Sequence, residues 1–468
     1  MKKIIVSAGL AAVGVAGFQS AFAGIRDVIA PNAWNVAATL RGFYDDNYSY
    51  TSHKYGSAGF ELLPSVVFHN QRQQTDIGMR YIYGLYFYGD RQESNIDPID
   101  QTHQFDLWIN HAINERWKVT ISDSFAMGQE PELLNDKGVL YRANGNNFAN
   151  HGNIVLDTEW TRKFSTSLHY ANNFYNYDNS GATLTTTTNL TYLPPLSSHA
   201  GSLAGWGTVA SSLAGTMNRI EQDIALDLQW HFQPETIGFV GYNFGLVNYT
   251  GDELIGAFNY ASGGIIVYPT TPPTYGAINR KQVLYYSNSR DSLSHYGYLG
   301  VQHQFTPNLS GSVRGGVSYT DSYNDPLQET TSLSPYADLS LVYTYRPGSY
   351  FQIGFSHDIN STDVVAVNNA TGSLTQYQES SIFYASINHR FTPKLLGTLV
   401  GHSQYSTFKG GSYNENSDTG YSVGANLNYQ FNRHFSADVG YSYDNLQSNS
   451  TDPTYNRNRV YIGLSANY

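Results

Sequence analysis

The sequence predicts an all-β fold, a transmembrane antiparallel up-and-down β-barrel of about eighteen strands. Long segments alternate between apolar and polar residues, and pairs of them flank short polar turns with aromatic residues at their edges. The last segment ends at Tyr468. A strand alternates in this way when its two faces meet different solvents, and aromatic side chains gather at the edges of a membrane barrel.

The C-terminal segment shows the alternation most clearly. One face of residues 459–468 carries Val460, Ile462 and Leu464, and the opposite face carries Arg459 and Asn467. Strands of about ten residues can cross a bilayer when tilted, whereas strands of soluble sheets usually have about five or six. The length therefore favours lipid over a soluble sandwich. A β-propeller, which also repeats at about 40 residues, would need four short strands in each repeat.

Eighteen segments have this character, and an even number places both chain termini on one side. Two of them are the weakest: residues 118–127, where Asp123 would face lipid, and residues 395–407, whose faces barely differ. A barrel of sixteen strands therefore remains an alternative. The expected strands are residues 34–44, 57–69, 75–88, 101–113, 118–127, 153–162, 165–174, 219–232, 236–249, 294–305, 309–322, 333–345, 349–360, 378–391, 395–407, 419–431, 434–445 and 457–468.

The N-terminal residues have the three parts of an export signal. Lys2 and Lys3 precede an apolar stretch, and Ala21-Phe22-Ala23 matches the site that signal peptidase cleaves. Bacterial barrels keep short turns periplasmic and long loops outside. The expected divisions are a signal peptide at 1–23, a short periplasmic segment at 24–33 and the barrel at 34–468, with long extracellular loops near 128–151, 175–218 and 250–293.

Composition excludes several functions. The chain has no cysteine, which suits an exported protein that uses no disulfides, and its net charge of −11 argues against nucleic acid as a partner. No motif for a nucleotide, a cofactor or a metal is present, although Asp45-Asp46-Asn47 could take up calcium. Gly420-x-Ser422-x-Gly424 fits a hydrolase nucleophile elbow, but it lies inside an alternating strand rather than at a sharp turn. We therefore expect no enzyme, no cofactor and no bound metal.

The last strands resemble the putative β-barrel porin family of Gram-negative outer membranes. The resemblance lies in Asn428–Ala437, Gly440–Tyr443 and Tyr455–Leu464, and over the earlier chain only the hairpin rhythm supports it. It implies an outer-membrane location in a Gram-negative bacterium and channel activity, without naming a solute. The closing residues also resemble the terminal signal by which the barrel-assembly machinery recognises its substrates, here Tyr461, Gly463, Ala466 and Tyr468.

The expected barrel is too wide to be filled by side chains. Eighteen strands about 4.8 Å apart and tilted about 40° close on a cylinder about 36 Å across, which must hold water or folded loops. Nine carboxylates and five arginines fall on the inward face, which predicts a mild preference for cations unless the charges pair across strands. The expected pore-lining residues are Arg41, Arg80, Asp106, Asp157, Glu159, Glu221, Asp223, Asp227, Arg314, Asp338, Asp358, Arg390, Asp438 and Arg459.

Two loops could modify this lumen. Residues 175–218 contain enough apolar side chains to pack against something, inside the barrel mouth or as an external cap, and residues 250–293 could extend as a hairpin. The first interpretation of the chain is thus a porin, monomeric or homotrimeric, that lies in outer-membrane lipid and passes small hydrophilic solutes. The alternatives are an oligosaccharide or polysaccharide channel, which would need a continuous aromatic track from Trp108, Tyr86, Tyr296 and Tyr298, and a membrane-embedded enzyme.

Overall fold

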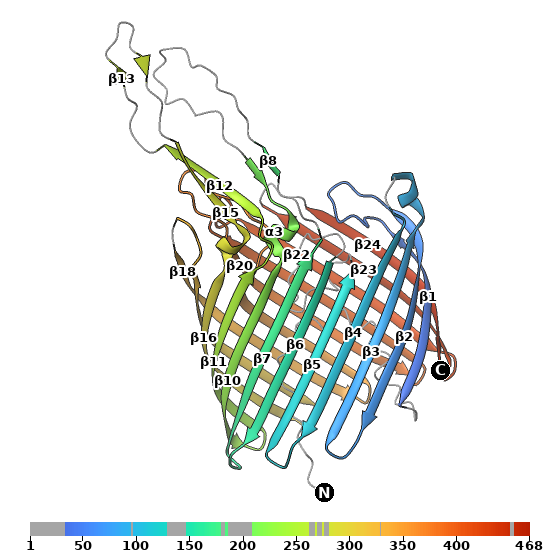
Figure 1. Ribbon diagram of the computed structural model, residues 1–468. Coiled ribbons are helices and arrows are strands. Elements are labelled where there is room, and N and C mark those ends of the chain that lie inside the picture. Colours follow the sequence, from blue (N-terminus) through green and yellow to red (C-terminus); the bar gives the residue numbers. More distant parts are fainter. Residues whose placement is uncertain are drawn as a thin grey trace.

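The computed structural model describes residues 33–94, 97–128, 147–178, 183–185, 208–261, 267–268, 274–275, 280–327, 329–449 and 454–468. Within them a single antiparallel sheet of eighteen strands closes on itself (Figure 1). The expected fold class is therefore confirmed, and the sixteen-strand barrel and the propeller are excluded. The expected signal peptide, nearly all of the segment at 24–33 and parts of the three long loops lie outside the described residues.

Each barrel strand pairs with the barrel strands before and after it in the chain, and the first pairs with the last. The strands are β1 (Trp34–Asp45), β2 (Ser57–Gln71), β3 (Thr75–Tyr88), β4 (Ile99–Ala112), β5 (Trp117–Gly128), β6 (Asn147–Glu159), β7 (Phe164–Tyr177), β10 (Arg219–Gln233), β11 (Thr236–Tyr249), β16 (Ser292–Thr306), β17 (Leu309–Ser322), β18 (Thr330–Arg346), β19 (Ser349–Asn360), β20 (Tyr377–Thr392), β21 (Leu395–Lys409), β22 (Ser417–Gln430), β23 (Phe435–Ser448) and β24 (Tyr455–Asn467).

One strand differs clearly from its expected bounds. Residues 153–162 were expected, whereas β6 runs from Asn147 to Glu159. The outward face of its first half carries Asn150 and Gly152 between Phe148 and Ile154, so the apolar and polar alternation by which the sequence is read is interrupted there. The doubtful strand at 118–127 is present as β5, and Asp123 does lie on its outer face, paired in register with Gly152.

The outer face of the barrel is apolar. Ile462 and Leu464 on β24 and Leu299 on β16 are more than 60 % exposed, while the side chains that alternate with them are polar. An exposed apolar wall around a polar interior is the arrangement that lipid requires of a closed barrel. Among the described residues, no helix is long and apolar enough to span a membrane.

The two rims of the barrel differ. At one rim the strands are joined by short turns, such as those after Gln71, Thr306 and Gln430, and aromatic rings cluster beside them: the Trp117 and Trp160 rings lie 5.8 Å apart. At the other rim the connections are longer and hold η3 (Gly89–Ser94), α3 (Leu213–Met217), η4 (Ser287–Arg290) and three two-stranded ribbons (Figure 1). The ribbons pair β8 (Thr183–Thr185) with β9 (Thr208–Ala210), β12 (Leu254–Ala261) with β15 (Arg280–Tyr286) and β13 (Val267–Tyr268) with β14 (Thr274–Tyr275).

Candidate pore and its inner wall

The expected pore-lining residues all lie on the face of their strands opposite to the exposed apolar side chains. On β10, for example, Glu221, Asp223 and Asp227 alternate with the exposed Ile224 and Leu226. The others occupy equivalent positions: Arg41 on β1, Arg80 on β3, Asp106 on β4, Asp157 and Glu159 on β6, Arg314 on β17, Asp338 on β18, Asp358 on β19, Arg390 on β20, Asp438 on β23 and Arg459 on β24.

The inner wall near the closing strands carries a chain of ion pairs. Arg41 donates to Glu61 at 2.9 Å and to Asp438 at 2.7 Å, and Arg459 reaches the other oxygen of Glu61 at 2.5 Å. These side chains are 11 % exposed or less, so solvent screens their attraction weakly. The chain joins β1, β2, β23 and β24, and so spans the seam at which the barrel closes.

A glycine makes the contact between Arg41 and Asp438 possible. Asp438 lies on β23, two strands away from Arg41, and Gly463 of the intervening β24 is opposite both residues in register. A Cβ atom at Gly463 would lie 2.3 Å from Cγ of Arg41 and 2.8 Å from an oxygen of Asp438. Only a residue without a side chain leaves the path between the two charges open.

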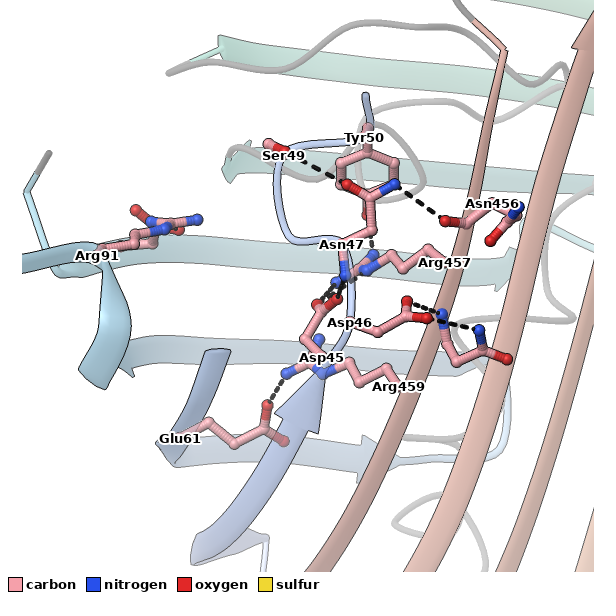
Figure 2. Close-up of polar contacts among 12 residues, drawn as sticks. Asp45, Asp46, Asn47, Ser49, Tyr50, Glu61, Arg91, Asn456, Arg457 and Arg459 are labelled. Atoms are coloured by element: carbon pink, nitrogen blue, oxygen red, sulfur yellow. Dashed lines mark hydrogen bonds and ion pairs between the residues drawn. The ribbon is translucent and has the colours of Figure 1, made fainter. Parts of the chain in front are cut away.

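The connection between β1 and β2 is tied to the same wall. Arg457 donates to Asp45 from two nitrogens, at 2.6 and 2.9 Å, and donates to the hydroxyl of Tyr50, whose ring centroid lies 4.5 Å from Cζ of Arg457 (Figure 2). The amide of Asn47 donates to the carbonyl of Asn456 at 2.9 Å. Asp45 and Asn47 are completely buried, so this connection bends onto the strands rather than into bulk solvent.

Asp46 is held at the edge of that connection. Burial opposes its ionisation, but hydrogen bonds from Lys54 and from the backbone and side chain of Asn458 outweigh burial and lower the pKa of Asp46. At Asp45-Asp46-Asn47, where the sequence suggested that calcium could bind, Arg457 pairs with Asp45 and Lys54 pairs with Asp46.

Further charges pair along the wall. Arg80 lies 2.5 Å from Asp106, Arg219 lies 2.7 Å from Glu221, and Arg314 lies 3.9 Å from Asp227. Asp157 instead accepts a hydrogen bond from the hydroxyl of Ser167 at 2.6 Å. Several of the expected charges therefore stiffen the wall in pairs, as the alternative interpretation of the inward charges proposed.

The lumen is packed near the rim with the long connections. Met217 of α3 is fully buried, and it belongs to one apolar cluster with Tyr175 of β7 and Ile382 of β20. Six barrel strands separate β7 from β20 in the shorter direction around the sheet. Side chains of opposite walls therefore meet through α3, the C-terminal part of the loop expected at 175–218, which lies inside the barrel mouth.

Arg290 holds this packing together. Its guanidinium donates to the carbonyl of Thr216 at 2.8 Å, to that of Thr362 at 3.0 Å and to that of Gln376 at 3.2 Å. The ring of Tyr249 lies 4.5 Å away. Arg290 is 1 % exposed and thereby joins η4, the end of α3 and the connection at 361–376.

The connection at 361–376 also carries apolar side chains into the mouth. Leu374 packs with Ile255 and Phe258 of β12 and with Tyr285 of β15, and Tyr285 donates to the carbonyl of Gly372. Burial raises the pKa of Tyr285, so its hydroxyl stays protonated and able to donate. The hairpin expected within 250–293 therefore rests on a connection whose role the sequence did not predict.

The aromatic candidates for a sugar track do not follow one path. Tyr296 and Tyr298 lie on β16 and contact Tyr336 of β18 at ring-centroid distances of 5.7 and 5.6 Å. Trp108 and Tyr86 lie on β4 and β3, on the far side of β5, β6, β7, β10 and β11. A Cβ atom at Gly78 would lie 1.9 Å from the Trp108 ring, so this ring lies flat against the wall.

The serine of the Gly-x-Ser-x-Gly motif has charged and basic neighbours in the sheet. Ser422 lies opposite His402 of β21 and Asp444 of β23, is completely buried, and donates to Asp444 at 2.5 Å. In a serine hydrolase the histidine lies between serine and acid and takes the serine proton. Here the serine is the middle residue and its proton points to the acid, so this row does not form that triad.

Several residues of the inner wall were missed by sequence reasoning. Glu61 and Arg219 lie at inward positions of the expected strands 57–69 and 219–232, so their register was a sufficient signal. Arg290, by contrast, lies in an irregular connection without any periodic pattern.

Comparisons with known proteins find one family model that matches part of the chain, and several solved structures with a distant likeness. A family model described as putative beta-barrel porin 2 matches residues 278–468. No curated protein matches the chain. The outer-membrane protein opdK from Pseudomonas aeruginosa has 9 % identity and a TM-score of 0.41, with 93 % of this chain and 99 % of that chain covered.

Two further structures are similar to the same low degree. OccAB4 of Acinetobacter baumannii has 11 % identity and a TM-score of 0.38, covering 93 % of this chain and 99 % of its own. OccK9 (OpdG) of Pseudomonas aeruginosa has 10 % identity and a TM-score of 0.41, covering 93 % and 98 %. These values say nothing about a solute. Residues 278–468, with the last nine barrel strands, match the putative beta-barrel porin 2 family, which confirms the resemblance, supports a porin role and supports an outer-membrane location.

Proposed function

We propose that this protein is a porin through which small hydrophilic solutes cross the outer membrane passively, with a mild preference for cations. The closed barrel with an apolar outer face and a charged, hydrogen-bonding inner face carries the proposal. Such an inner face offers ions and polar solutes partners in place of the water that they lose.

The burial of inward residues along β20 supports a lumen that is narrower at the rim with the long connections. On β20, Gln378, Ser380 and Ile382 are 4 % exposed or less, whereas Tyr384 and Ser386, farther from the long connections, are half-buried. Solutes would therefore meet the main restriction at the mouth that contains α3, and a wetter passage beyond it.

The preference for cations rests on the carboxylates that arginines do not neutralise directly. Asp157 accepts its 2.6 Å hydrogen bond from an uncharged hydroxyl, in contrast to Asp106 and Asp438, which face arginines. A charge acts over about 10 Å at 0.1 M salt and about 3 Å at 1 M salt, so the preference should weaken as salt is raised.

Reversal potentials across a planar bilayer under a salt gradient test this function. We expect ohmic channels that favour cations at 0.1 M salt, less preference at 1 M salt, and a smaller preference at 0.1 M for Asp157→Asn. Ser436→Ala, an uncharged change on the inner face of β23, is the matched control. Absence of conductance would contradict passive diffusion of solutes through the barrel. Anion selectivity would contradict the preference for cations that is inferred from the inner carboxylates.

Two other expectations belong to the same proposal. The longer connections would face the outside of the cell, because bacterial barrels keep their short turns in the periplasm. The terminal strand β24, with Tyr461, Gly463, Ala466 and Tyr468, would be the segment that the barrel-assembly machinery recognises.

A further inference from the structure

The outer face of β5 carries a charged side chain, Asp123. Asp123 alternates on β5 with Ser122 and Ser124 of the inner face and shares the outer face with Ile121 and Met127. Both oxygens of its carboxylate accept from the side-chain amide of Asn150 on β6, at 3.1 and 3.2 Å.

Asp123 begins a row of polar and small residues across four neighbouring strands. It lies opposite Gly152, which lies opposite Asn172 of β7, which in turn lies opposite Gln222 of β10. These positions share the outer face with the exposed Ile154, Leu168 and Leu226. We call Asp123, Asn150, Gly152, Asn172 and Gln222 the outer polar patch.

The position of Asp123 along its strand places the patch within the membrane. Asp123 is six residues beyond Trp117, whose ring lies in the aromatic cluster at the rim with the short turns. Six residues of a strand tilted about 40° rise about 15 Å, and the apolar band of such a barrel is about 25 Å tall. Hydrocarbon offers no hydrogen bonds to the carboxylate or to the amides around it.

Two strands opposite the patch, β22 and β24, have no such polar row on their outer faces. On the far wall, the outer faces of β22 and β24 carry Val423, Leu427, Ile462 and Leu464, which are 40 to 69 % exposed and entirely apolar. Lipid alone would favour the same apolar surface on β5, β6, β7 and β10. The polar patch on those strands indicates that they meet something other than lipid.

We propose that the outer polar patch is the contact surface between two copies of this chain. The patch is self-complementary, because it offers one charged acceptor, Asp123, together with the amide donors of Asn172 and Gln222. In a two-fold contact the amides of each copy donate to the carboxylate of the other, and polar side chains in membranes join protein segments in this way. Gly152 has no side chain, which lets the two walls approach closely at the centre of the patch.

The mass of the purified full chain in mild detergent tests this contact. Light scattering, corrected for bound detergent, should give twice the mass of one chain. Asp123→Leu combined with Asn172→Leu should reduce that mass to a single chain, whereas Asp123→Asn, which keeps a hydrogen-bonding side chain, should retain the larger mass. Val423→Leu on β22 is the matched control and should change nothing.

Two outcomes would overturn the proposal. A wild-type protein with the mass of one chain would show that copies do not associate. An unchanged mass in the double leucine variant, with a higher unfolding midpoint, would show that the patch faces lipid. Heat-dependent gel migration checks that each variant is a folded barrel, and leucines on an outer face should not prevent folding.

Discussion

Arg457 illustrates how a single residue joins a connection between strands to the barrel wall. Its guanidinium is 3 % exposed and pairs with Asp45, which is completely buried. Removing one partner of a buried pair leaves the other charge without compensation, which destabilises a protein by about 3–5 kcal/mol. Replacing one partner should therefore destabilise the protein more than replacing both partners with uncharged residues.

We predict that Arg457→Gln destabilises the barrel by about 3–5 kcal/mol, because Asp45 stays buried and charged. Chemical unfolding followed by tryptophan fluorescence measures the change. Arg457→Gln combined with Asp45→Asn should recover a large part of the loss. If the double variant is as unstable as the single one, the ion pair is not the cause.

Asp291 gives a pH dependence of known sign. Burial raises the pKa of this carboxyl above its ordinary value of about 3.9, although the backbone N–H of Tyr249 and the amide of Asn324 donate to it. Because the pKa of Asp291 is higher in the folded state than in the unfolded state, protonation of this carboxyl stabilises the folded protein. Its contribution to the free energy of unfolding is fully present below about pH 3.9 and is lost as pH rises through the raised pKa.

The unfolding midpoint of the wild type should therefore fall, relative to that of Asp291→Asn, as the pH rises from about 4 toward neutrality. The asparagine keeps an acceptor for the Tyr249 N–H but cannot ionise. Midpoints measured at several pH values for both proteins check this. Parallel curves for the two proteins would show that Asp291 does not titrate in this range.

The elements of the barrel differ in how well the sequence predicts them. Strands such as Ser349–Asn360 were predictable to the residue, because lipid outside and water inside impose a period of two along their whole length. β6 was not, because Asn150 stands on its outer face where the pattern expects an apolar residue. The apolar and polar alternation fails in the part of β6 that belongs to the outer polar patch.

The contacts of the inward connections could not be predicted, although the apolar content of residues 175–218 indicated that this loop packs against something. Arg290 contacts Thr216, Thr362 and Gln376, which are 72 to 86 residues distant in sequence. No local periodicity encodes such contacts, since they depend on which loops meet after the barrel has closed. The inward position of residues such as Asp438 and Arg80 was thus predictable from the register of their strands. The contacts between the connections in the barrel mouth were not.

The connections around Arg290 form the element whose loosening should be visible in transport. In Arg290→Ala the carbonyls of Thr216, Thr362 and Gln376 lose their common donor, so α3 and residues 361–376 are held less firmly in the mouth. We predict a higher single-channel conductance and more frequent switching between levels in planar bilayers, because hydrogen bonds to a charged group contribute about 1.5–3 kcal/mol each.

Arg290→Lys separates the charge from the hydrogen bonds. A lysine keeps the positive charge, but its compact ammonium cannot reproduce the planar fork that reaches several carbonyls at once. It should therefore change conductance in the same direction as the alanine. A lysine variant that behaves as the wild type would indicate that the charge alone matters at this position.

At the scale of the whole molecule, the chain closes by bringing its two ends together. β1 pairs with β24 from Ala37 and Asn467 to Asp45 and Arg459, and Val36 and Tyr468 exchange two further backbone hydrogen bonds of 3.0 and 2.8 Å. The ion pairs of Arg41 and Arg457 cross the same seam. The closing strand thus combines backbone pairing with buried charges, and both depend on its inner face being correctly filled.

Substitution of Gly463 tests whether this glycine acts through packing at the seam between β1 and β24 or as part of the signal that the barrel-assembly machinery recognises. A Cβ atom at this position would collide with Arg41 and Asp438, and overpacking of this kind destabilises proteins by about 1–3 kcal/mol. Gly463→Ala should therefore lower the unfolding midpoint and slow refolding of the purified chain in detergent, where no assembly machinery is present. Ile462→Val, on the exposed outer face of β24, is the control. If Gly463→Ala refolds as the wild type in detergent but fails to reach the membrane in cells, the glycine acts as part of the assembly signal rather than through the path it leaves for the ion pair.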